Sequence, residues 1–175
     1  SGDAGDLSAS ALADAPVVLL GAPDAATAPE VALLERFVRA RGGSLIVLPD
    51  RVPSGPVLGL VGRGWRERLE ADAVGDGPLR ATELLVRRPG GTSEVVAGSD
   101  DLAMAVGEPA GRGRVVVVTA MDAWRHRAVD GDRFDRFWQA LVADAVDAAG
   151  PAVSVAVSPS VVTPGAAVVV DVLVR

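Results

Sequence analysis

The sequence predicts an α/β fold with three layers, in which helices cover both faces of a mostly parallel sheet and a short β segment follows. Two apolar runs, 16–20 and 44–49, contain no alternating polar residues, which is typical of strands that are buried on both faces. A helical pattern over 31–41 lies between these runs. A third apolar run at 114–120 precedes a second amphipathic helical pattern over 134–146, so strands and helices alternate along the chain.

The first predicted unit is strand–helix–strand over residues 16–49. Thr27 and Glu30 fit a capping box, which begins a helix, and Gly42–Gly43 fit the glycine that commonly follows the end of one. Such a connection between parallel strands is almost always right-handed. Residues 1–15 are small and polar, and we expect them to form a loose lead-in or a short helix.

The middle of the chain has a less regular pattern, rich in glycine and proline. We expect a short helix near Trp65–Ala71 and a strand over 81–88, with Glu94–Ala97 pairing back onto that strand. The runs 102–106 and 114–120 flank a glycine-containing turn, which indicates an antiparallel hairpin.

The C-terminal part changes from a helical period to a period of two. Asp130 or Asp132 can cap the last helix, and Gly150–Pro151 would end it. Beyond that point valines alternate with small or polar residues on both sides of a Pro-Gly turn, which predicts two half-buried antiparallel strands. We therefore expect an α/β domain over 1–150 and a β segment over 151–175 that begins an Ig-like sandwich.

The composition excludes several classes of function. The chain has 175 residues, a net charge of −6 and no cysteine, so disulfides, thiolate zinc sites and cysteine nucleophiles are all excluded. The acidic balance argues against nucleic acid as a partner. No apolar run reaches the ~18 residues of a membrane helix, and the first fifteen residues lack the basic start of a signal peptide. We expect the chain to be a piece of a longer protein.

Four short motifs occur in chain order: a GG-x-L, a G-x-G-R-V, a W-R and an F-W, at Gly42–Leu45, Gly111–Val115, Trp124–Arg125 and Phe137–Trp138. Together they resemble the class I glutamine amidotransferase-like domain of large bacterial membrane-associated proteins. The resemblance covers 16–149, with a poor match through 50–100. It implies a flavodoxin-like fold and a place at the cell envelope in a membrane-anchored protein, with the cytoplasm as the alternative.

The amidotransferase activity does not follow from the resemblance. A glutamine amidotransferase uses a cysteine nucleophile at a strand-to-helix elbow, and residues 60–68, where an elbow would lie, contain neither cysteine nor serine. The chain is similar to members of this group that look like pseudo-enzymes. We therefore expect a binding or scaffolding module of a larger envelope-associated protein, without catalytic residues, cofactor or metal. Other protein segments or domains are its expected partners, and a homodimer through the C-terminal strands is a further option.

Ligand-binding candidates follow the third apolar run: Asp122, Trp124, Arg125 and His126. The carboxyl ends of strands are the usual ligand sites of open α/β sheets. Asp122 could instead cap the loop or pair with Arg125, and His126, which lies between two arginines, could be structural or face solvent. The alternative function is a hydrolase or carbohydrate-active enzyme that uses Asp122 and His126 in one cleft, with Asp100 as an optional third residue.

Overall fold

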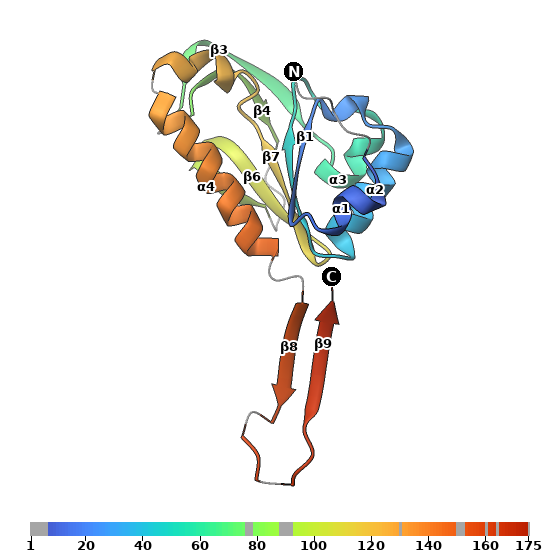
Figure 1. The fold of residues 1–175 in the computed structure, drawn as a ribbon. Helices are drawn as coiled ribbons and strands as arrows, with labels where there is room; N and C mark the ends of the chain where they lie inside the picture. The colour runs from blue at the N-terminus through green and yellow to red at the C-terminus, as the bar shows by residue number, and fades with distance from the viewer. Residues whose placement is uncertain are drawn as a thin grey trace.

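A five-stranded sheet with the order β1–β2–β7–β6–β5 forms the centre of the protein (Figure 1). The structure is a computed structural model that describes residues 7–75, 79–87, 93–129, 131–149, 153–159, 161–163 and 165–174. The strands of this sheet are β1 (Val17–Gly21), β2 (Ser44–Leu48), β5 (Glu94–Ser99), β6 (Leu102–Ala110) and β7 (Gly113–Val118). β1, β2 and β7 run parallel, whereas β6 and β5 are antiparallel to their neighbours.

The predicted three-layer, flavodoxin-like fold with a mostly parallel sheet is wrong. Among the described strands, two pairings are parallel and four are antiparallel, so the fold is mixed α/β. The lengths of the connections explain the difference. Asp100–Asp101 alone join β5 to β6, and Gly111–Arg112 alone join β6 to β7. Parallel neighbours need a crossover of a dozen residues or more, so these short turns permit only antiparallel pairing.

The predicted strand–helix–strand unit is present, and its two strands pair in parallel. Its helix α2 (Ala28–Arg39) begins at the capping box, where the backbone N–H of Thr27 donates to Glu30 Oε2 at 2.7 Å. The helix ends before Gly42, which has a left-handed φ of 80°. The next residue, Gly43, lies so close to the Phe37 ring that a Cβ there would be 2.2 Å from it. The chain therefore turns sharply into β2.

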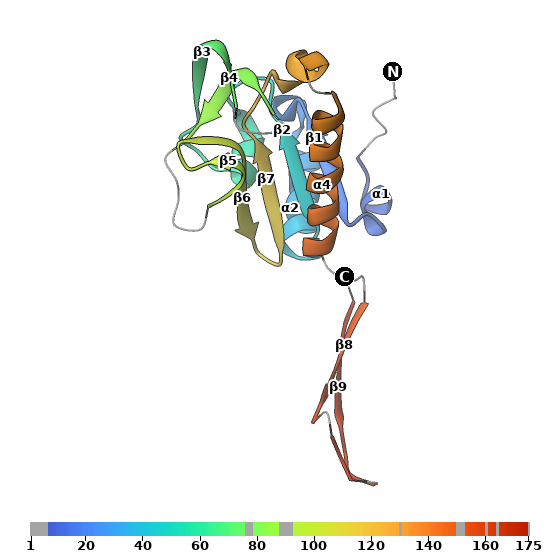
Figure 2. The same ribbon diagram turned by 90° about the vertical axis from the view of Figure 1, so that its left-hand side faces the viewer.

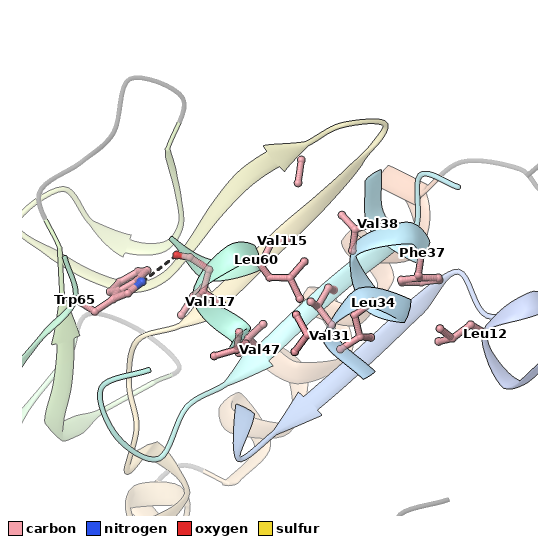
Figure 3. Close-up of a cluster of buried hydrophobic side chains, with 14 of the residues drawn as sticks. Leu12, Val31, Leu34, Phe37, Val38, Val47, Leu60, Trp65, Val115 and Val117 are labelled. Carbon is pink, nitrogen blue, oxygen red and sulfur yellow. Dashed lines mark hydrogen bonds between the residues drawn. The ribbon is translucent and has the colours of Figure 1, made fainter. Parts of the chain in front are cut away.

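Helices cover both faces of the parallel part of the sheet (Figure 2). The helices α1 (Ala9–Ala13), α2 and α3 (Leu58–Val61) lie on one face, and α4 (Gly131–Ala149) lies on the other. Figure 3 shows side chains of α2 over β2 and β7. Alternate residues of β2 and β7 point to opposite faces, and both sets are buried: Leu45, Val47, Val115 and Val117 towards α2, and Ile46, Val116 and Val118 towards α4.

A second, two-stranded antiparallel sheet consists of β3 (Arg66–Val74) and β4 (Ala81–Val86). The predicted helix near Trp65–Ala71 is wrong, because this segment is β3. Its sequence has no apolar stripe that a helix could bury, whereas the ladder with β4 supplies its backbone partners. The predicted pairing of Glu94–Ala97 with 81–88 is also wrong, because β5 pairs with β6.

A third sheet is the hairpin of β8 (Val153–Ser158) and β9 (Val169–Val174), which confirms the two predicted antiparallel C-terminal strands. Their predicted half-burial is wrong, because the described side chains of this hairpin are exposed on both faces. It projects away from the rest of the protein (Figures 1 and 2). The predicted caps of α4 at Asp130 and Gly150–Pro151 lie outside the described residues, and the domain boundary near residue 150 stays a prediction. No helix in the described part of the chain combines the length and hydropathy needed to cross a membrane.

Candidate functional site

The carboxylate of Asp122 is buried and holds the start of β4. Asp122 lies just before the 3₁₀ helix η3 (Ala123–Val129), and its side chain is 2% exposed. Its Oδ1 accepts hydrogen bonds from the backbone N–H of Thr82 at 2.9 Å and of Glu83 at 3.0 Å, and its Oδ2 accepts one from Thr82 Oγ1 at 2.5 Å. This predicted ligand-binding residue thus acts as a link between η3 and β4.

The hydrogen bonds also decide the charge of this carboxyl group. Burial is the largest single effect and by itself raises the pKa of Asp122. The hydroxyl of Thr82, the two backbone N–H groups and the contact with His126 act in the opposite direction, and together they hold the pKa of Asp122 below its ordinary value. Asp122 is therefore ionised at neutral pH, and its charge is stabilised within the protein.

The other predicted residues lie around this carboxylate. Arg125 Nη1 lies 2.7 Å from Glu83 Oε1 and 3.9 Å from Asp122 Oδ2. The guanidinium of Arg125 lies 5.3 Å from the ring centre of Trp124, whose side chain is 67% exposed. His126 Nε2 is 3.5 Å from Asp122 Oδ2, which is too long for a good hydrogen bond. Within the described residues, no group of three histidine or carboxylate side chains could hold a metal ion.

A cavity of about 660 Å³ lies elsewhere, between the β3–β4 hairpin and the β5–β6 hairpin. We call it the split groove. Asp100 lines it, but Asp122 and His126 do not. The structure therefore places Asp122 beside His126, whereas Asp100, the further residue of the hydrolase alternative, lines the split groove instead. Sequence reasoning missed this groove because its β3 wall was predicted to be a helix.

The groove exists because the sheet divides at Thr119. The backbone N–H of Thr119 donates to the carbonyl of Met104 at 2.9 Å, and its hydroxyl donates to the carbonyl of Ala103 at 2.5 Å, both on β6. The carbonyl of the same residue accepts from the N–H of Leu85 on β4 at 2.8 Å. One buried residue thus holds two strands, which diverge from there and leave the groove between them.

Charged and aromatic side chains close one part of the groove. Arg87 forms an ion pair with Glu108, and Ser93 donates a hydrogen bond to the same carboxylate at 2.5 Å. The guanidinium of Arg87 lies 4.5 Å from the ring centre of Trp65. Burial lowers the pKa of Arg87. The indole N–H of Trp65 donates to the carbonyl of Val61 at 2.9 Å, so this ring is held in place (Figure 3).

Comparisons with known proteins do not identify a family. No family model matches the chain, and no curated protein matches it. Among solved structures, the chain is similar to the exo-β-1,4-mannosidase Op5Man5 from Opitutaceae bacterium strain TAV5, at 19% identity and a TM-score of 0.45. The match covers 66% of this chain and 23% of the mannosidase. This likeness is too low to support a fold or an activity, and the resemblance to amidotransferase-like domains stays a prediction.

Proposed function

We propose that the chain is a non-catalytic binding module that attaches to an apolar β-sheet of another domain or protein through the β8–β9 hairpin. One observation carries this proposal. The register pairs Val155 with Val172 and Val157 with Val170, and paired residues of an antiparallel ladder lie on the same face. Val153 is on that face too, two residues before Val155. These five valines form an apolar face, which we call the valine face.

The valine face is exposed in the structure. Val155 is 60% exposed and Val172 is 58% exposed. The opposite face carries Ala156, Ser158 and Asp171, together with Val169. Full burial of a valine side chain contributes roughly 1.5–3 kcal/mol, so a face of this kind favours a partner that covers it. An isolated two-stranded hairpin is also only marginally stable in water, which adds to the need for a partner.

The size of the face favours a sheet over a second copy of the hairpin. Six residues of extended chain span roughly 20 Å, and two strands are only about 10 Å wide. If two copies of the valine face packed against each other, they would bury less surface area than the roughly 1,200 Å² of a stable interface. A larger sheet can cover the valines and also pair with a free strand edge, as in a β-sandwich.

We propose a non-catalytic module because of the surroundings of Asp122. The hydrogen bonds from Thr82 and Glu83 occupy its carboxylate, so it is not free to act as a general base or a metal ligand. His126 lies beside Asp122, as the hydrolase alternative requires, but the hydrogen bonds to the carboxylate argue against that alternative. The location in an envelope-associated protein stays a prediction from the resemblance.

Site-specific photocrosslinking tests the proposal. A photoreactive phenylalanine replaces Val155 or Val172 on the valine face, and Ala156 or Asp171 on the opposite face as matched controls, in protein expressed in its own host. We expect crosslinks from the valine face alone, to peptides of a β-sheet domain. The purified partner should then bind the chain and lose affinity with the Val155→Thr, Val172→Thr variant.

Two results would overturn the proposal. One is equal crosslinking from both faces, or none from either, because the valine face would then have no special partner. The other is hydrolysis of glutamine or nitrophenyl glycosides by the purified chain that is lost in Asp122→Asn, because Asp122 would then take part in catalysis.

A further inference from the structure

The split groove has the size and the lining of a ligand site. Its volume of about 660 Å³ lies within the range of roughly 300–1,000 Å³ that is usual for sites that bind small molecules. It runs between two pairs of extended strands. Apolar side chains from three of these strands line it: Leu84, Val86, Val95, Leu102 and Val106. The groove can therefore bury the apolar part of an elongated ligand.

Among the described residues, six charged side chains also line the groove, and three of them are neutralised by the protein itself. The three internal ion pairs are Arg68–Glu70, Arg87–Glu108 and Arg114–Glu94. The side chains of Arg66, Asp100 and Asp101 have no hydrogen bond or ion pair in the described part of the chain. Arg66 belongs to β3, and the two aspartates form the turn between β5 and β6. Of the side chains that the structure describes, one free cation and two free carboxylates thus lie on different walls of the groove.

This charge pattern selects among ligand classes. A fatty acid or another simple anion would satisfy Arg66 but would leave the two aspartates without a counterion. A simple cation would leave Arg66 without one. A ligand that carries a positive group, a carboxylate and apolar side chains on an extended backbone matches all of these features, and a short peptide has this composition.

We propose that the split groove binds a short apolar peptide with free ends, its ammonium group at Asp100–Asp101 and its carboxylate at Arg66. The proposal goes beyond the binding function assigned to β8–β9, because it concerns another surface and another ligand. It needs no contact with the valine face.

Nuclear magnetic resonance of the ¹⁵N-labelled, full 175-residue chain tests the proposal, with the tetrapeptide Val-Leu-Val-Val as the probe. We expect shifts of backbone resonances at residues that line the groove, such as Leu84 and Leu102, and none in β8–β9. Acetylation of the amino end, or amidation of the carboxyl end, should each weaken binding by up to about fivefold, which is the size of an exposed ionic contact.

Charge-removing variants assign each end of the peptide. In Asp100→Asn, Asp101→Asn, the free and acetylated peptides should bind equally, while amidation should still weaken binding. In Arg66→Gln, the free and amidated peptides should bind equally, because the peptide carboxylate then has no counterion, while acetylation should still weaken binding. Asp147→Asn and Arg63→Gln are matched controls, since both residues are exposed and neither lines the groove, and they should change nothing.

Three results would overturn the proposal. The first is the absence of shifts around the groove at millimolar peptide in a chain whose spectrum shows it folded. The second is equal binding of the free, acetylated and amidated peptides to the unmodified chain. The third is tighter binding of decanoate than of the peptide, which would make the groove a site for amphipathic anions. None of these results bears on the valine face, so the two proposals can fail independently.

Discussion

The hairpins β3–β4 and β8–β9 are both two-stranded sheets outside the five-stranded sheet, but only the first is attached to it. Asp122 binds the start of β4, and Leu84 of β4 is buried against Ala120. In β8–β9 the described valines are about half exposed or more. β8 and β9 are rich in valine, which forms strands readily, whereas β3 consists mainly of charged residues and alanine and is a strand through its pairing with β4. A strand can therefore form with or without a favourable local sequence, whereas its burial depends on another element that supplies an apolar face.

The largest expected difference between the hairpins is the cost of removing an apolar side chain. Leu84→Ala should destabilise the protein by about 2–5 kcal/mol, because Leu84 is 1% exposed and its loss leaves a cavity. Urea denaturation followed by circular dichroism measures this cost. Leu69→Ala, at an exposed leucine of β3, is the matched control and should cost at most about 0.5 kcal/mol. Equal costs would show that Leu84 is no better packed than the exposed Leu69.

The second prediction concerns the attachment itself. Asp122→Ala removes the acceptor of two backbone N–H groups, and an unpaired buried donor costs about 1–3 kcal/mol. We expect the free energy of unfolding to fall by about 2–4 kcal/mol and amide hydrogen exchange to become faster in β4, with little change in β2. Asp147→Ala on the exposed side of α4 is the control. If exchange in β4 does not change, Asp122 does not hold this hairpin.

The third prediction follows from the lowered pKa of Asp122. A carboxyl group whose pKa is lower in the folded state stabilises the protein above its unfolded-state pKa of roughly 3.9, and this contribution is lost as the pH falls through the folded-state value. The stability difference between the unmodified chain and Asp122→Asn should therefore be largest near pH 6 and shrink below about pH 4. Urea denaturation of both proteins at several pH values measures it. A difference that grows on acidification would contradict the assignment.

The smallest expected effect is in β8–β9. Val172→Ala should change stability by at most about 0.5 kcal/mol, because Val172 already contacts water. The same change at Val116, buried in β7, should cost about 2–3 kcal/mol through lost burial and the cavity left behind. Urea denaturation compares the two variants. A large cost at Val172 in the isolated chain would mean that the hairpin packs against the body in solution.

The sequence predicts local structure well where one pattern dominates. The strand–helix–strand unit over 16–49 was predicted because its buried runs, its capping box and its glycine end all agree. The partners of the strands were predicted less well. The apolar run of β5 has the same pattern whether it pairs with β4 or β6, and only turn length and packing decide which strand it joins. The segment 65–71 was assigned to the wrong element because charged residues at neighbouring positions suit a helix and an exposed strand equally.

The candidate site shows the same limit. The sequence places Asp122 after a buried strand, but it does not reveal that Thr82, forty residues earlier, donates to its carboxylate. It also gives no sign of the split groove, because the groove depends on the hydrogen bonds that Thr119 donates to β6 and accepts from β4. Sites that form where segments meet in this way are visible only in the fold.

The division of the sheet at Thr119 keeps the groove open before a ligand enters it. Main-chain hydrogen bonds to β6 and β4, together with the bond from the Thr119 hydroxyl to β6, set the spacing of the walls next to Thr119. Such a receptor is preorganised, so little conformational entropy is lost on binding, and association needs no rearrangement of this part of the backbone.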